Sequence, residues 1–166
     1  MSKNKRRHFL SRLGHSFAGI AGVSLASAGL ASKTAQAHHT DTHFEDKAVH
    51  RLVYQCNKAE PNYINHVLFS CGEMLRKHGD DIELVVTTLG PGLNLLANRP
   101  KRAIYPEQQQ RVNSLAQYGV RFQACGNTMK SMNWSEDDLL EVAEVVPIGV
   151  EGIMLLQEQG YSYFSW

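Results

Sequence analysis

The sequence has few of the residues and motifs that mark common metal, disulfide and nucleotide sites. It contains three cysteines, an odd number, and no C-x-x-C pair, so no disulfide framework is indicated. A G-x-x-x-x-G-K phosphate loop is absent, and "GPGLNL" has Leu95 where a dinucleotide-binding loop needs its third glycine. From residue 38 onward there is also no G-x-S-x-G or H-E-x-x-H motif. Function must therefore be sought in individual side chains.

Long hydrophobic runs are also scarce. The run from Ser16 to Ala31 carries no charge, but its length of about 16 residues is short of the ~20 that a membrane-spanning helix needs. It follows Arg6-Arg7 and precedes Ala35-Gln36-Ala37, an A-x-A cleavage pattern, so the segment resembles a twin-arginine export signal. We predict that residues 1–37 are removed on export and that the mature protein is periplasmic, with no stable membrane insertion. The alternative is an uncleaved amphipathic anchor.

Basic charge is sparse after this signal. Six of the 17 basic residues lie in residues 1–37 and none of the 16 acidic ones do, so the remainder has 11 basic residues and a net charge of −5. Sequence-independent nucleic-acid binding needs a clustered basic face, and the one cluster left is Arg99, Lys101 and Arg102. We expect no nucleic-acid partner.

Residues 38–48 are polar and poor in apolar side chains, which predicts a flexible leader before the domain. The leader contains His38, His39 and His43. After cleavage His38 would be the amino terminus, where it could chelate copper together with a second imidazole, although a polar arm without fixed geometry is the favoured interpretation. His38 is thus a weak metal candidate, and we predict no other metal and no cofactor.

Residues 49–166 are predicted to form one α/β domain, because short β-branched and aromatic runs alternate with segments of helical period. The second apolar run, "DIELVVTTLG", is nearly continuous, which is typical of a strand buried on both faces. The pattern predicts a three-layer α/β/α fold around a mostly parallel five-stranded sheet. Strands are expected at 49–56, 81–90, 120–125, 143–147 and 161–166, and helices at 61–79, 106–119 and 149–160, with Ser135 and Asp138 close to a capping box.

Ligands of open parallel sheets collect outside the carboxyl ends of the strands. Cys125 is predicted at the end of the third strand, Cys56 at the end of the first, and Gly90-Pro91-Gly92 after the second. For the three-residue segment, turn geometry is favoured over anion binding. Cys71 instead lies on the apolar face of helix 61–79, where a free cysteine behaves as a small hydrophobic residue.

Cys125 is the candidate reactive thiol. Between a strand end and a following helical turn, a cysteine can meet free backbone N–H groups, which favour the thiolate and lower its pKa. Gly126 leaves room for a partner's sulfur, and Asn127 and Thr128 can donate hydrogen bonds or cap the turn. The alternative is an inert core cysteine. Cys56 remains open as a possible second thiol, a disulfide partner or a packed core residue.

Four segments in order resemble the DsrE/DsrF-like family of sulfur-relay proteins: "LVYQC", "VVTTLGPGLNLL", "GVRFQACGNTM" and "VVPIGVEGIMLLQEQGYSYF". The resemblance implies a five-stranded parallel sheet between helices and self-association into homotrimers or homohexamers. It also implies that sulfane sulfur is carried as a cysteine persulfide. The family's acceptor cysteine lies in the loop after the third strand, and Cys125 matches it.

Two features depart from the well-known members, which act in the cytoplasm. This chain has a predicted export signal, and its "CGNTM" context matches a less-characterised branch of the family. We therefore predict a periplasmic sulfur carrier or sulfurtransferase-like protein that holds a persulfide on Cys125. Its partners would be sulfur donor and acceptor proteins or inorganic species such as thiosulfate and polysulfide. The alternative is a non-catalytic oligomeric binding subunit with inert cysteines.

Overall fold

The computed structural model describes residues 48–166, so the predicted export signal, His38 and all of the leader except its last residue lie outside the described residues. The described part contains five strands: β1 (His50–Cys56), β2 (Ile82–Thr88), β3 (Arg121–Cys125), β4 (Ala143–Val146) and β5 (Ser162–Phe164). Its α-helices are α1 (Pro61–His78), α2 (Pro106–Gln117), α3 (Gly126–Met132) and α4 (Gly149–Glu158). Short 3₁₀ helices are η1 (Gly79–Asp81), η2 (Gly90–Leu96) and η3 (Glu136–Asp138).

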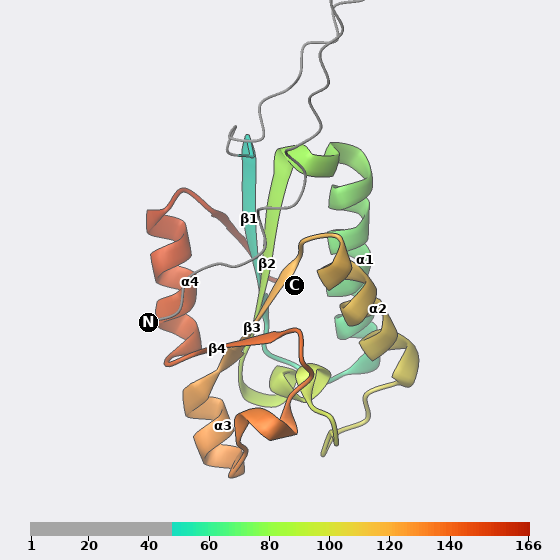
Figure 1. Cartoon of the computed structure of the whole chain (residues 1–166), viewed down its shortest axis with the longest axis vertical. Helices are drawn as coiled ribbons and strands as arrows, with labels where there is room; N and C mark the ends of the chain where they lie inside the picture. The colour runs from blue at the N-terminus through green and yellow to red at the C-terminus, as the bar shows by residue number, and fades with distance from the viewer. Residues whose placement is uncertain (1–47) are drawn as a thin grey trace, which may run out of the picture. The chain divides into compact units, whose positions relative to one another are not determined.

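The five strands form one sheet in the order β4-β3-β2-β1-β5, and every neighbouring pair is parallel. Helices α1 and α2 cover one face, and α4 lies on the other (Figure 1). Strands β1 to β4 are added in one direction across the sheet, whereas β5 returns to the far side of β1. Because parallel crossovers are right-handed, this reversal places α4 on the face opposite α1 and α2. The predicted three-layer α/β/α fold with a five-stranded parallel sheet is confirmed.

The larger core lies between the sheet and the α1–α2 layer. Helix α1 begins at Pro61, where a missing backbone N–H costs nothing. Its buried side chains recur at three- and four-residue spacing and pack against the sheet. Burying each large apolar side chain contributes roughly 1.5–3 kcal/mol. The α1 side chains in this core are Tyr63, Ile64, Val67, Leu68 and Cys71.

The opposite face has a much smaller core, because α4 alone covers it. Ile153 and Leu156 of α4 pack with Val53 and Val85 of the sheet and with Tyr161. Val150 is 63% exposed, and Met154 and Leu155 are also exposed, so one side of α4 presents apolar side chains outward. Polar side chains of β3 and β4 on this face are left beside the helix.

The segment after β3 differs from the expectation. The sequence predicted one helical turn after Cys125, whereas α3 runs for seven residues and ends at Asn133, whose backbone is left-handed. Asp138 Oδ2 accepts a hydrogen bond from the Ser135 N–H at 2.8 Å, as the predicted cap requires. The helix it caps has only three residues, because the chain then turns away and Leu140 N–H bonds to Leu96 O at 2.8 Å.

Among residues 48–166, no helix combines the length and the apolar composition that a membrane crossing needs.

Candidate functional site

The carboxyl edge of the sheet brings Cys125 to the start of α4. Cys125 is the last residue of β3 and pairs in register with Val146, the last residue of β4. The chain turns at Pro147, and α4 begins at Gly149 beside the thiol. The Gly149 N–H donates a hydrogen bond to Cys125 Sγ across 3.2 Å. This N–H belongs to the first turn of α4, where backbone donors have no partner within the helix and favour an anion.

Gly149 is a glycine because α4 approaches Cys125 so closely. A Cβ on residue 149 would lie 2.9 Å from Cys125 Cβ and 3.3 Å from its Sγ. Any side chain there would push the helix or the thiol away. Cys125 is only 6% exposed, so the helix end and its preceding loop also cover most of the thiol.

Thr128, in the first turn of α3, completes the contacts of the thiol. Its hydroxyl accepts a hydrogen bond from the Gly90 N–H at 3.0 Å and donates one to Cys125. A hydroxyl that accepts from one side is oriented to donate on the other. The turn after β2, the first turn of α3 and the end of β3 are thereby joined in one network around the sulfur.

These hydrogen bonds decide the ionisation of Cys125. Burial alone would raise the pKa of the thiol, but the Thr128 hydroxyl and the backbone N–H groups of Gly149, Thr128 and Asn127 outweigh it. The pKa of Cys125 therefore lies below its ordinary value of 9.0. A larger thiolate fraction near neutral pH makes the sulfur a better nucleophile.

The other residues singled out around Cys125 have separate surroundings. Asn127 is exposed, and its contribution to the thiol is its backbone N–H. A Cβ on Gly126 would lie 3.1 Å from Pro147 O and 3.2 Å from Val146 O, so the space beside Gly126 is filled by this chain's own backbone.

Cys56 lies at the same edge of the sheet but in the larger core, on the face covered by α1 and α2. It is fully buried, and burial raises the pKa of its thiol to about 12. Its carbonyl accepts from the Leu89 N–H at 3.1 Å, and a Cβ on Gly92 would lie 2.2 Å from that oxygen. Of the three alternatives for Cys56, this environment favours packing. The Gly90-Pro91-Gly92 segment packs the turn directly against β1.

Cys71 lies on the buried face of α1, as predicted, and its thiol pKa is also raised to about 12 by burial. All three cysteines are free. Within residues 48–166, no three His, Cys, Asp or Glu side chains gather as a set of metal ligands. His50 and His78, which are distant in sequence, do meet with ring centroids 4.5 Å apart.

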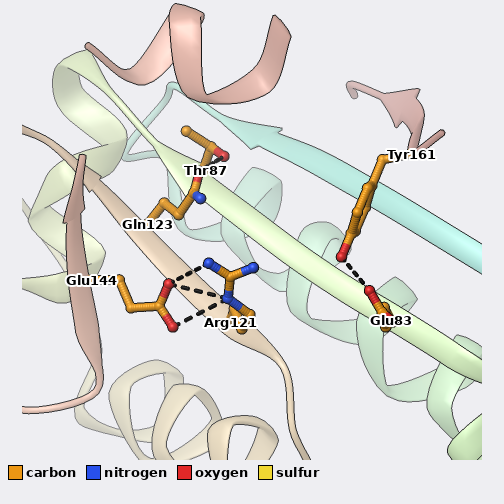
Figure 2. A network of polar contacts seen from close by, with 6 residues as sticks. All are labelled: Glu83, Thr87, Arg121, Gln123, Glu144 and Tyr161. Carbon is orange, nitrogen blue, oxygen red and sulfur yellow. Dashed lines mark hydrogen bonds and ion pairs between the residues drawn. The ribbon is translucent and has the colours of Figure 1, made fainter. Parts of the chain in front are cut away.

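Sequence reasoning missed a row of polar side chains that starts at the thiol. Alternate residues of a strand share a face, so Arg121 and Gln123 lie on the α4 side of the sheet with Cys125. Figure 2 shows Arg121 joined to Glu144 and, farther across the sheet, Tyr161 joined to Glu83. The signal was the R-x-Q-x-C alternation within "RFQAC", where a buried strand face would otherwise carry apolar residues.

The arrangement suits a nucleophilic thiolate that takes up and releases a small group. The sulfur has donors that stabilise its anion, and neither of the other two thiols shares its surroundings. Thiol–disulfide and persulfide exchange need only such a thiolate and an accessible partner sulfur. A negative charge that develops on the sulfur during release is stabilised by the same N–H and O–H groups.

Comparisons with known proteins bear on the fold and the family of the chain. No curated protein matches the chain. Among solved structures, it resembles the protein of unknown function MTH1491 from Methanobacterium thermoautotrophicum, with 25% sequence identity and a TM-score of 0.64 over 70% of this chain and 99% of that one. The model of the DsrE/DsrF-like family matches residues 50–166, which include every strand and helix described above. The chain therefore belongs to the DsrE/DsrF-like family, and this membership suggests a sulfur-related function.

Proposed function

We propose that this protein is a sulfur carrier with sulfurtransferase-like chemistry, which holds sulfane sulfur as a persulfide on Cys125. The observation that carries the proposal is the set of hydrogen bonds from Gly149 and Thr128 to the Cys125 sulfur, which lowers the pKa of this one thiol. Family membership supports a role in sulfur metabolism.

The chemistry follows from thiolate attack. The Cys125 thiolate attacks the outer sulfur of a donor persulfide or polysulfide, a new S–S bond forms at Sγ, and the donor leaves as a thiolate or shortened polysulfide. An acceptor thiolate then attacks the outer sulfur and restores the Cys125 thiolate. The Gly149 N–H and the Thr128 hydroxyl stabilise the anion at both stages.

The proposal includes a periplasmic location and assembly into a homotrimer or homohexamer. The location rests on residues 1–37, which lie outside the described residues. Assembly is supported by the apolar side chains that α4 presents away from the sheet, namely Val150 and Met154. Donors and acceptors would be periplasmic proteins or inorganic sulfur species.

Cyanolysis tests the carrier function. The protein is incubated with inorganic polysulfide, freed of excess reagent by gel filtration and treated with cyanide, which removes sulfane sulfur as thiocyanate. We expect about one thiocyanate per chain in the wild type and in Cys71→Ala, and none in Cys125→Ala. Equal thiocyanate from wild type and Cys125→Ala would reject the assignment.

A second candidate is a non-catalytic oligomeric binding subunit with inert cysteines. The observation that favours it is the 6% exposure of Cys125, because a covered thiol meets reagents slowly. It predicts that native Cys125 is alkylated as slowly as Cys71. Alkylation of Cys125 at least ten times faster than Cys71 would instead support the carrier.

A further inference from the structure

A groove runs between α4 and the β3–β4 part of the sheet, with a volume of about 200 Å³; we name it the α4–β3 groove. Cys125 is not among its lining residues, but two residues next to the thiol site are. Val146, which lines it, is the register partner of Cys125, and Ile148, which also lines it, directly precedes Gly149.

The floor of the groove contains a buried amide with a free end. Gln123 is only 5% exposed, and its Oε1 accepts a hydrogen bond from the Thr87 hydroxyl at 2.9 Å. No acceptor within residues 48–166 takes a hydrogen bond from its Nε2. Nε2 is not among the buried side-chain atoms that lack a partner, so it faces the open groove, where it is available to a ligand that supplies an acceptor.

Charged groups of opposite sign lie at the rim. Arg121 donates from Nε and Nη2 to Glu144, at 3.1 Å and 2.7 Å to its Oε2 (Figure 2), and it also has a side-chain hydrogen bond with Tyr161. Arg121 is four residues before Cys125, which is about 13 Å along a strand. Glu151, exposed on α4, lines the groove as well. A ligand that carries both a carboxylate and an ammonium group can use both charges.

Most of the remaining lining is apolar, although part of it is exposed. Leu155 and Leu156 of α4 and Pro147 line the groove. Gly152 brings the helix near the sheet, because a Cβ there would lie 3.1 Å from Gln123 Oε1. The volume is below the ~300–1,000 Å³ of pockets for drug-sized ligands, but the groove is open, so it holds one end of a small extended molecule while the rest lies outside.

We propose that the α4–β3 groove binds a small zwitterionic peptide thiol in its hydropersulfide form, R–S–SH, and presents the outer sulfur to Cys125. The carboxylate lies at Arg121, the ammonium group at Glu151, and a backbone carbonyl of the ligand accepts from Gln123 Nε2. This inference rests on the proposed persulfide chemistry of Cys125 and names the class of its donor.

The transfer step balances without an oxidant or reductant. The Cys125 thiolate attacks the outer sulfur of R–S–SH, the bond between the two donor sulfurs breaks, and a bond from Sγ to the outer sulfur forms. The products are Cys125–S–SH and R–S⁻, so the hydropersulfide proton stays on the transferred sulfur. The thiolate product keeps its zwitterionic end and leaves the groove by exchange with the next donor.

The test compares two donors on the same protein. Glutathione hydropersulfide carries the zwitterionic end, whereas inorganic polysulfide lacks it, and the rate of persulfide formation at Cys125 is followed by intact-mass spectrometry for each. We divide the rate with glutathione hydropersulfide by the rate with inorganic polysulfide. We expect this ratio to fall about tenfold in Arg121→Gln, because a charge-assisted hydrogen bond is lost, and about threefold in Glu151→Gln. Matched controls are Arg51→Gln, from the same sheet face, and Glu158→Gln, from the same helix; neither residue lines the groove. An unchanged ratio in both groove variants overturns the inference.

Binding is measured separately with S-methylglutathione, which cannot transfer sulfur. Isothermal titration calorimetry should show saturable binding to wild type and to Cys125→Ser, with weakened binding to Arg121→Gln and to Glu151→Gln. If polysulfide loads Cys125 but S-methylglutathione does not bind, the donor class is wrong and the carrier function stands. If S-methylglutathione binds but no donor loads Cys125, the groove is a ligand site and the carrier function is wrong. Should Arg121→Gln fail to fold by circular dichroism, the exposed Glu151→Gln decides the outcome alone.

Discussion

The backbone N–H of Gly149 donates a hydrogen bond to Cys125 Sγ across 3.2 Å, and it ties the first turn of α4 to the end of β3. Both residues sit where parallel strands of this sheet end, yet they are 24 positions apart in the sequence. The contact makes the properties of the thiol depend on where α4 begins. The predictions below follow from this contact and from the packing around it.

Thr128→Val should move the pH midpoint of Cys125 alkylation upward. The Thr128 hydroxyl bond lowers the pKa of Cys125, and valine keeps the shape of threonine without that donor. Because the thiolate is the reacting species, alkylation at neutral pH should slow several-fold. Iodoacetamide rates between pH 6 and 10, with the modified residue located by mass spectrometry, provide the measurement. Thr128→Ser keeps the hydroxyl and should behave like wild type; identical profiles for valine and wild type would refute this role of Thr128.

Gly149→Ala should disturb both stability and reactivity. Its Cβ would crowd Cys125 Cβ at 2.9 Å and Sγ at 3.3 Å, which we expect to cost about 1–3 kcal/mol in the free energy of unfolding. Displacement of the helix would lengthen the N–H to Sγ bond and slow alkylation of Cys125. Gly152→Ala is the control from the next turn of α4, because its Cβ would meet Gln123 and Val146 instead. Equal alkylation rates for Gly149→Ala and Gly152→Ala would contradict the account.

Gly92→Ala should destabilise the domain by about 3 kcal/mol or more. Its Cβ would lie 2.2 Å from the Cys56 carbonyl oxygen and 2.7 Å from the carbonyl carbon, and this backbone belongs to a strand in the sheet. Urea denaturation measures the loss. Gly72→Ala in α1 meets only the flexible end of Arg111 at 3.1 Å, and alanine favours a helix, so this variant should be neutral or up to about 1 kcal/mol more stable. A Gly92→Ala protein as stable as Gly72→Ala would show that the close approach is absent in solution.

The stability of the protein should fall above pH 9 in part because of Cys71. Burial raises the pKa of Cys71 from 9.0 to about 12, so above pH 9 the unfolded chain loses the thiol proton while the folded chain keeps it. The free energy of unfolding should therefore drop by about 1.4 kcal/mol per pH unit from this thiol, until the pH reaches the folded-state value. Urea denaturation at pH 8 and pH 10.5 should show a drop about 2 kcal/mol larger in wild type than in Cys71→Ala. A drop of the same size in both proteins would argue against a protonated, buried Cys71.

Much of the fold was predictable because its signals are local. Pro61 and Gly79 bound a helix with a clear apolar face, and the apolar run around Val85 indicated a strand covered on both sides. The position of Cys125 at the end of β3 followed from the same reasoning.

The contacts that control Cys125 were harder to predict, because they join distant segments. Nothing near Gly149 in the sequence says that its N–H meets a sulfur 24 residues earlier, and the bond from Gly90 to Thr128 spans 38 residues. The partial closure of the second face also depends on packing. Ile153 and Leu156 of α4 pack against the sheet, but the helix leaves Arg121 and Gln123 beside a groove. The alternation of "RFQAC" alone could not distinguish a solvated face from a binding surface.

The most direct test of the central claim is intact-mass spectrometry of the mature protein after exposure to inorganic polysulfide, with native alkylation to locate the added sulfur. The account predicts a gain of about 32 Da per added sulfur atom on Cys125, reversed by reductant, absent in Cys125→Ser and retained in Cys56→Ala. An unmodified Cys125 in the folded wild-type protein, or the same gain in Cys125→Ser, would contradict it.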